Sequence, residues 1–254
     1  MCTLVVAFYP KTKTPLVIAS NRDENPKRDA QPWAFRYFGL DNQKPDFNTF
    51  APSIYCPLDV LGGTWIGTNS AGIFCAITNW DLDENFHGRG LKSRGHLVLK
   101  SLTRTSITDV VEYWAGLDAS HHKPFHMLAG TVNDLYCLSC DNKKLIITKL
   151  RAGVHISTGI GFNQKVPRDT FIRKNLLTMK DLYQPVNPNT LLKLMSSHDC
   201  GIGSEDSVCV HDNEHRWETR STAMLINDER AWKIKSKDGP ACSGGDWTTE
   251  MIKL

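Results

Sequence analysis

Two apolar runs near the start of the chain have the length and residue types of β-strands. Residues 3–9 form the first run and residues 15–20 form the second. Residues 10–14 between them make a turn-like connection that is short enough for a hairpin. Antiparallel pairing would bring the end of the second run, with the polar stretch 21–24, back beside the start of the first. The pattern therefore predicts a polar cluster next to position 2.

The remaining pattern predicts strand-rich ends around a helical middle. A second hairpin fits the runs 63–68 and 73–78 around turn residues. Apolar periodicity then predicts, in chain order, helices 96–102 and 107–114, strands 125–130, 135–138 and 145–149, helices 167–179 and 189–197, and strands 207–210, 222–226 and 231–234. This order indicates an α+β fold built from stacked layers, with 1–254 as a single domain.

Residues 25–61 separate the two hairpins and are expected to be irregular, because prolines recur through them. The segment also carries aromatic residues, among them Trp33, Phe35, Phe38, Phe47 and Phe50. A long loop in a compact domain is often functional, so one interpretation is a lid or a pocket wall. The alternative is a packed Ω-type loop that its aromatic residues anchor.

Glycines in the second hairpin indicate a close approach of another group. Gly62, Gly63 and Gly67 would weaken a strand unless something lies against its backbone. That group is either a neighbouring element or a substrate.

Composition indicates an ordinary globular protein. Charged residues make up 22% of the 254 residues, and the formal net charge of +3 is too small to predict a nucleic-acid partner. No apolar run approaches the length of a membrane span, and the start of the chain lacks the pattern of a secretory signal. The eight cysteines show no small-domain disulfide spacing. We therefore expect a cytoplasmic protein with reduced thiols.

Cys2 is the candidate nucleophile. Removal of Met1 would give this residue a free α-amine beside its thiol, so that base and nucleophile would belong to one residue. Strand periodicity places Asn21 and Asp23 on one face and Arg22 and Glu24 on the other. An arginine near a thiol favours the thiolate, and an aspartate can hold an ammonium group. The alternatives are a buried strand cysteine and a solvated, charged turn.

Several motifs extend this cluster along the chain. Met1-Cys2 and Asn21-Arg22-Asp23-Glu24 are followed by the glycine-rich run 62–67, by Ala76-Ile77-Thr78-Asn79, by Ser93-Arg94-Gly95 and by Thr219-Arg220-Ser221. Together they resemble the NRDE family, also called transport and Golgi organisation-like proteins. That family is similar in architecture to the cysteine N-terminal-nucleophile hydrolases, which include penicillin V acylase and bile-salt hydrolase. The resemblance implies a four-layer αββα sandwich.

The resemblance also implies roles for particular residues. Cys2 would be the nucleophile, Arg22 and Asp23 would tune its thiol and amine, and Asn79 would donate to the oxyanion. Arg220 resembles the distal arginine of the hydrolases. Further candidate binding residues are Asn21, Glu24, Trp65 and Trp80. The two tryptophans would line the pocket, and the alternative is that they are ordinary core residues.

One departure from the family pattern concerns its Ser-Asn element, which is Ser157-Thr158 in this chain. Thr158 is then a shorter donor, Asn163 substitutes for the missing amide, or the position has no role.

Two functions fit these residues. The first is an amidohydrolase that acts on a linear C–N bond of a small or lipophilic amide. The second is a non-catalytic binding or trafficking protein for haem or acyl lipids, classes that the family resemblance implies. No cofactor or metal is expected, because Cys137-x-x-Cys140 lacks a second ligand pair.

Overall fold

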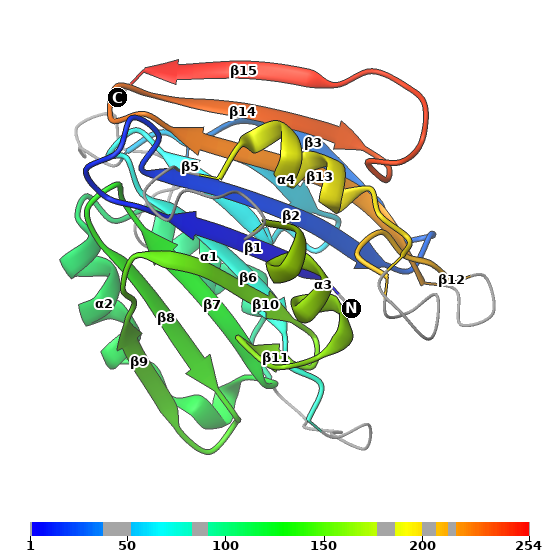
Figure 1. Cartoon of the computed structure of the whole chain (residues 1–254). Coiled ribbons are helices and arrows are strands. Elements are labelled where there is room, and N and C mark those ends of the chain that lie inside the picture. Colours follow the sequence, from blue (N-terminus) through cyan, green and yellow to red (C-terminus); the bar gives the residue numbers. More distant parts are fainter. Residues whose placement is uncertain are drawn as a thin grey trace. The chain divides into compact units, whose positions relative to one another are not determined.

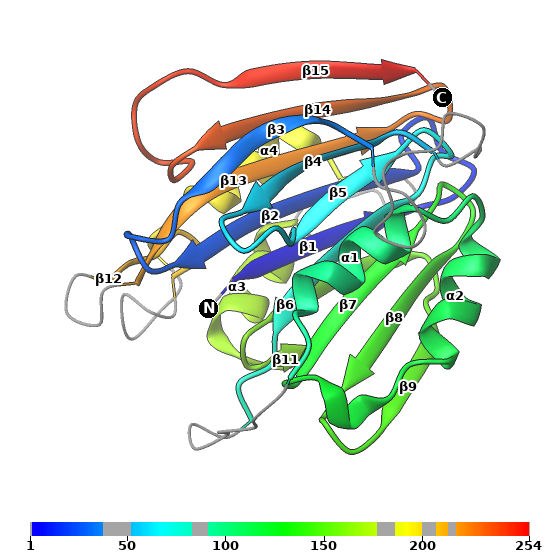
Figure 2. The ribbon, with the colours of Figure 1, turned by 180° about the vertical axis from the view of Figure 1, so that it is seen from behind.

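The computed structural model describes residues 2–37, 52–82, 91–176, 186–199, 207–212 and 217–253. The chain divides into two compact units, each built on one antiparallel sheet (Figures 1 and 2). Unit 1 contains residues 1–28 and 151–253, and unit 2 contains residues 29–150. The single-domain assignment stays a prediction. Among the described residues, no helix combines the length and the apolar character that crossing a membrane requires.

The sheet of unit 1 is ordered β11-β10-β1-β2-β13-β14-β15, and β12 pairs with β13. Its strands are β1 (Thr3–Phe8), β2 (Leu16–Glu24), β10 (Gly153–Thr158), β11 (Gly161–Phe162), β12 (His211–Asp212), β13 (Trp217–Asn227), β14 (Ala231–Asp238) and β15 (Thr248–Lys253). The predicted β1–β2 hairpin is confirmed. Strands β10, β11 and β15 were not predicted, and the predicted strand 207–210 is wrong. That segment is a buried bend that precedes β12.

Strand β2 lies between β1 and β13, and its register places the polar cluster. Asn21 lies opposite Thr3 on one side and Thr222 on the other, while Asp23 lies opposite Thr219. The register shifts between Thr219 and Ser221, which makes Arg220 the extra residue of a β-bulge. Every residue of β1 is buried, so both faces of this strand are covered.

Two helices of unit 1, α3 (Pro167–Leu176) and α4 (Pro188–Met195), pack on one face of its sheet (Figure 1). Helix α4 begins at a proline, and the Asn187 side chain caps it by accepting a hydrogen bond from the Asn189 N–H. The core under these helices joins alternate residues of the strands, such as Val5 and Ala19, to Ile172 and Leu191.

The sheet of unit 2 is ordered β3-β4-β5-β6-β7-β8-β9. Its strands are β3 (Ala30–Arg36), β4 (Ile54–Asp59), β5 (Ile66–Asn69), β6 (Phe74–Asn79), β7 (Phe125–Gly130), β8 (Leu135–Cys140) and β9 (Leu145–Lys149). Helices α1 (Arg94–Leu102) and α2 (Ile107–Ala115) cover one face of this sheet (Figure 2). Trp114 of α2 is fully buried there, and its indole N–H donates to Ser101 Oγ at 2.9 Å.

The expectation of an irregular segment over residues 25–61 is partly wrong, because β3 and β4 pair within it. Trp33 and Phe35 of β3 lie against Tyr55 of β4, with ring centroids 5.5 and 5.1 Å apart. These cross-strand aromatic contacts stabilise the pair. Phe38, Phe47 and Phe50 lie outside the described residues, so the lid interpretation stays a prediction.

Neighbouring elements account for two of the hairpin glycines. A Cβ atom on Gly63 would lie 3.0 Å from the Gly95 Cα atom. A Cβ atom on Gly67 would lie 2.7 Å from Cys56 Cβ and 2.8 Å from Leu102 Cδ1. The close approach predicted at these positions is therefore the packing of β5 and its flanking loop against β4 and α1.

Gly67→Ala should lower the free energy of unfolding by about 1–3 kcal/mol, because the added methyl group overpacks the contact of β5 with β4 and α1. Urea denaturation would measure the loss. Gly116→Ala is the matched control, since its added Cβ atom would lie no closer than 3.7 Å to the atoms around it. Equal stability of the two variants would contradict the packing described.

Candidate active site

The β1–β2 pairing brings Cys2 to Asp23. Cys2 directly precedes β1 and is partly exposed, and its Sγ atom lies 3.7 Å from the backbone carbonyl oxygen of Asp23. Burial of the sulfur raises the pKa of the Cys2 thiol, and the nearby Asp23 carboxylate raises it further. We expected Arg22 to favour the thiolate, but these two effects favour the neutral thiol. A nucleophile at this position therefore needs a base.

The Asp23 carboxyl group is almost completely buried and is held by two side chains. The Thr219 hydroxyl donates a hydrogen bond to Oδ1 at 2.7 Å, and Arg168 Nη1 lies 3.8 Å from Oδ2. Burial raises the pKa of Asp23, whereas Arg168 and Thr219 oppose that increase. Asp23 is thus a buried acid next to the thiol, with a cation and a hydroxyl group placed to stabilise its charged form.

Arg168 is a site residue that we did not predict. It lies in the first turn of α3, is 3% exposed, and donates a hydrogen bond to Thr3 Oγ1 at 2.8 Å. A cation is unfavourable at a helix N-terminus because the helix dipole is positive there. The unusual position of an arginine directly after Pro167 is the one local sign of this role, and it does not identify the acidic partner.

Asn21 connects three segments of unit 1. Its side-chain amide donates to the Met195 carbonyl at 2.9 Å and to the Val208 carbonyl at 2.8 Å. Its carbonyl oxygen accepts a hydrogen bond from the Thr222 hydroxyl at 2.9 Å. Asn21 therefore ties β2 to α4, to β13 and to the segment before β12. A ligand could use this side chain only by replacing one of those bonds.

The other charged residues of the cluster are paired locally. Arg22 is buried, and its Nη1 donates to the Arg28 carbonyl at 3.2 Å. Glu24 forms an ion pair with Arg28 at 2.9 Å, and Arg220 of the bulge forms one with Glu218, also at 2.9 Å. Glu24 and Glu218 are opposite each other in register, and the two arginines offset the repulsion between them.

Asn79, Trp65 and Trp80 belong to unit 2. Asn79 is exposed at the end of β6, where a side-chain amide is accessible to a ligand. Trp80 packs on the His126 ring, with centroids 4.4 Å apart, and the Trp65 carbonyl accepts a hydrogen bond from the Ile77 N–H. The structure describes each unit by itself. A shared site of Asn79 with Cys2 therefore stays a prediction.

The Ser157-Thr158 element lies on β10, next to the start of β1. Thr158 is buried and opposite Thr3. The Asn163 side-chain oxygen accepts hydrogen bonds from the Ile156 N–H at 2.9 Å and from Arg173 Nη2 at 2.6 Å. Asn163 therefore stabilises the turn between β10 and β11, which leaves Thr158 as the better placed of the two candidates.

A cavity of about 610 Å³ lies in unit 2, beside α1 and α2. Its lining combines basic and polar side chains with apolar ones, namely Lys92, His96, Lys100, His121 and His122 with Leu97, Leu99, Tyr113 and Leu117. One carboxylate, that of Asp118, also lines the cavity and lies 3.9 Å from His121 Nε2, so the basic side chains outnumber it. None of the predicted site residues is among the described residues that line it. Its composition suits a ligand with both an apolar part and an anionic group.

Sequence comparison decides the family. The sequence model of the family described as Transport and Golgi organisation 2 matches residues 1–237. The chain belongs to this family. The predicted resemblance is therefore confirmed, and it covers both units. No curated protein sequence matches the chain.

Solved structures confirm the fold of this family member. A cysteine-to-alanine mutant of the conjugated bile acid hydrolase from Clostridium perfringens matches with a TM-score of 0.51 and 13% identity, over 98% of this chain and 96% of that chain. The N-acylethanolamine-hydrolyzing acid amidase ortholog of Caenorhabditis elegans matches with a TM-score of 0.57 and 10% identity, over 88% and 92% of the two chains. The predicted fold class, an αββα sandwich of the N-terminal-nucleophile hydrolase type, is confirmed by this likeness.

Asp169 is a second buried carboxyl group of this protein, and it directly follows Arg168 on α3. It is 1% exposed, and neither carboxylate oxygen has a hydrogen-bond partner among the described residues. Burial raises the pKa of Asp169 from an ordinary 3.8 to about 7, although Arg173 and Arg168 act in the opposite direction. The native protein therefore holds this proton over a pH range in which the unfolded chain has released it.

The free energy of unfolding should fall as the pH rises from about 4 to about 7, because unfolding releases the Asp169 proton in that range. Asp169→Asn should reduce this dependence and should be more stable than the wild type at pH 8 by roughly 2–4 kcal/mol. Denaturation at several pH values would measure both effects. Asp246→Asn, on an exposed loop, is the control and should follow the wild type. A pH dependence shared by all three proteins would contradict the buried position of Asp169.

Proposed function

We propose that the chain is a cysteine hydrolase of the N-terminal-nucleophile type that cleaves a small or lipophilic amide. The observation that carries the proposal is the position of the Cys2 thiol. Its Sγ atom lies 3.7 Å from the backbone carbonyl oxygen of Asp23, the residue whose buried side chain pairs with Arg168. The names of the structural neighbours, a conjugated bile acid hydrolase and an acid amidase, favour an amide with a lipophilic acyl part. The proposal places the protein in the cytoplasm, where thiols stay reduced.

Removal of Met1 gives Cys2 the base that its neutral thiol needs. The released α-amine, with a pKa near 7.7–8.0, takes the thiol proton, and the thiolate attacks the amide carbon. The C–N bond then breaks, and the ammonium group returns its proton to the leaving amine. The same α-amine then takes a proton from water, and the hydroxide attacks the thioester carbon. The C–S bond breaks and the ammonium group returns its proton to the Cys2 thiolate, so that a carboxylic acid and an amine are the products.

The residues around Cys2 have complementary roles in this proposal. The Asp23 carboxylate holds the ammonium form of the α-amine, and Arg168 and Thr219 keep that carboxylate charged and in place. Arg22 and Arg220 supply positive charge on the same strands. Asn79 donates to the oxyanion, a contribution that is typically worth about 2.7–4 kcal/mol of transition-state stabilisation.

Intact mass spectrometry tests both the processing and the nucleophile. After exposure to a panel of acyl amides, we expect a chain that has lost Met1 and carries one acyl group on Cys2, because thioester formation precedes hydrolysis. Cys2→Ala should abolish both the adduct and the turnover. Cys137→Ala is the control, since the Cys137 thiol is buried and its pKa is raised to about 12. Turnover that persists in Cys2→Ala, or a chain that keeps Met1 while active, would rule out the mechanism.

A second candidate function rests on the cavity of unit 2. Its histidines and lysines, beside apolar residues, suit an amphiphilic anion such as haem or an acyl lipid. Burial lowers the pKa of His122, so that its ring is neutral near pH 7, the form that binds a metal. A binding or trafficking protein would use this cavity without turnover at Cys2.

Absorbance titration with haemin distinguishes this second function. If it holds, the wild type should give a spectral shift that saturates at one haemin per chain. His122→Ala, which removes the neutral imidazole, should weaken binding at least 10-fold, which is about 1.4 kcal/mol. His155→Ala, whose ring lies in unit 1, should bind as the wild type does. No spectral shift at micromolar protein would discard haem as the ligand.

A further inference from the structure

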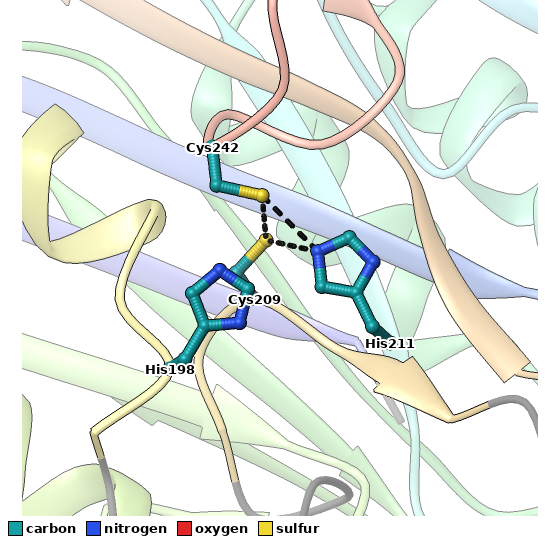
Figure 3. Close-up of side chains that lie close together, drawn as sticks. All are labelled: His198, Cys209, His211 and Cys242. Atoms are coloured by element: carbon teal, nitrogen blue, oxygen red, sulfur yellow. Dashed lines mark hydrogen bonds between the residues drawn. The ribbon is translucent and has the colours of Figure 1, made fainter.

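Four side chains with metal-binding atoms converge in unit 1, away from Cys2 in sequence (Figure 3). They are His198, Cys209, His211 and Cys242, and their ligand atoms all lie within 4.8 Å of one another. They come from three separate segments: the stretch after α4, the residues that lead into and begin β12, and the loop after β14. The expectation of no metal site missed this cluster, because the four ligands are spread over 45 residues of the chain and share no metal-binding motif.

Of the distances among three of the ligand atoms, one matches the edge of a zinc tetrahedron, and the other two are shorter by roughly 0.4–0.5 Å. Cys209 Sγ lies 3.3 Å from Cys242 Sγ and 3.6 Å from His211 Nε2, and His211 Nε2 lies 3.1 Å from Cys242 Sγ. With Zn–S of about 2.3 Å and Zn–N of about 2.0–2.1 Å, a tetrahedron requires edges of roughly 3.5–3.8 Å. A metal ion at the centre would need Cys242 Sγ to move away from Cys209 Sγ and from His211 Nε2 by roughly 0.5 Å.

His198 is placed to complete the set. Its ring is stacked on the His211 ring, with centroids 5.0 Å apart and planes inclined by 7°. The lone pair of an imidazole nitrogen lies in the ring plane, so two parallel rings cannot direct lone pairs at one point. His198 is exposed, and a rotation of its ring would turn a nitrogen toward the two sulfur atoms. The site thus has three preformed ligands and one that turns in.

We propose that these four residues bind one zinc ion in a closed Cys₂His₂ site. Two thiolates and two neutral imidazoles suit zinc, because this borderline-soft ion accepts both sulfur and nitrogen ligands in tetrahedral geometry. Binding releases the two thiol protons, and the resulting centre has no net charge. Four protein ligands leave no open position, so the zinc is structural rather than catalytic. None of the four ligands takes part in the chemistry proposed for Cys2.

The backbone around the ligands is already fixed by other bonds. The Cys209 N–H donates to the Ser197 carbonyl at 3.0 Å, and Ser207 Oγ donates to the His198 carbonyl at 2.9 Å. The buried Lys237 ammonium donates to the carbonyls of Ser243 and Gly244, next to Cys242. Such bonds orient metal ligands before the ion arrives, which lowers the cost of ordering them on binding.

The site also lies next to the residues that hold the polar cluster of β2. Cys209 stands between Val208, whose carbonyl binds Asn21, and Val210, whose N–H donates to Thr219 Oγ1 at 2.9 Å. Thr219 in turn donates to Asp23. A zinc ion on Cys209 would therefore stabilise the segment that positions Asn21 and Asp23.

Zinc and cobalt binding to the reduced, chelator-treated full chain tests the proposal. We expect one Zn²⁺ per chain, protection of two thiols from alkylation that mapping assigns to Cys209 and Cys242, and a higher melting temperature. Co²⁺ should give the strong visible absorption of tetrahedral cobalt together with a thiolate charge-transfer band. If the reduced chain binds neither Zn²⁺ nor Co²⁺ at micromolar protein, the proposal is overturned. A Cys209–Cys242 disulfide in the untreated protein would then be the alternative explanation for the close approach of the two sulfur atoms.

Variants assign the ligands. Cys242 is exposed, so Cys242→Ser should not disturb folding. The variant should lower the intensity of the thiolate-to-cobalt charge-transfer band, because one of two thiolates is lost, and should weaken Zn²⁺ binding. His198→Ala should weaken binding at least about 10-fold, the loss that removal of even an outer-shell partner causes. Cys137→Ser and His155→Ala are the matched controls and should bind as the wild type does. Unchanged cobalt spectra in Cys242→Ser would show that the ion is held elsewhere.

Discussion

The pairing of β2 with both β1 and β13 is the constraint on which the structure of unit 1 depends. A central strand that is buried on both faces normally consists of apolar residues, yet β2 ends in Asn21, Arg22 and Asp23, all of which are buried. Each of these side chains has to find a partner within the protein, because an unpaired buried polar group costs about 1–3 kcal/mol or more. Two threonines on β13, the arginine in the first turn of α3 and backbone carbonyls supply those partners.

The two buried carboxyl groups near α3 are treated differently by the fold. Asp23 has a hydroxyl donor and a cation beside it, whereas Asp169 has neighbouring arginines but no hydrogen-bond partner among the described residues. Arg168 acts on both, and its side chain also donates to Thr3, directly after Cys2. A single guanidinium group thus connects the start of β1, the cluster on β2 and the first turn of α3.

Local sequence pattern was enough to predict the elements whose contacts join residues close together in the sequence. The β1–β2 hairpin, the β5–β6 hairpin and the four described helices follow from apolar periodicity and turn residues, which act over a few residues. Strand β3 was not predicted because Pro32 and the surrounding polar residues obscure its alternation. Arg168 and the His198–Cys242 cluster could not be predicted, because their partners come together only through pairings distant in sequence. Asn79 and Cys2 are also distant in sequence, so local pattern does not determine the position of one relative to the other.

The order of the strands along the chain has a consequence for how the protein is made. Unit 2, residues 29–150, is inserted between the second and third strands of the other unit. The N-terminal hairpin is therefore synthesised long before β10 and β13, its neighbours in the sheet, and a two-stranded hairpin alone is at best marginally stable in water. While the ribosome translates the intervening segment, the unpaired backbone edges and the apolar faces of β1 and β2 stay available to wrong partners. A chaperone that shields them during this interval would have its greatest effect on the segment that carries Cys2.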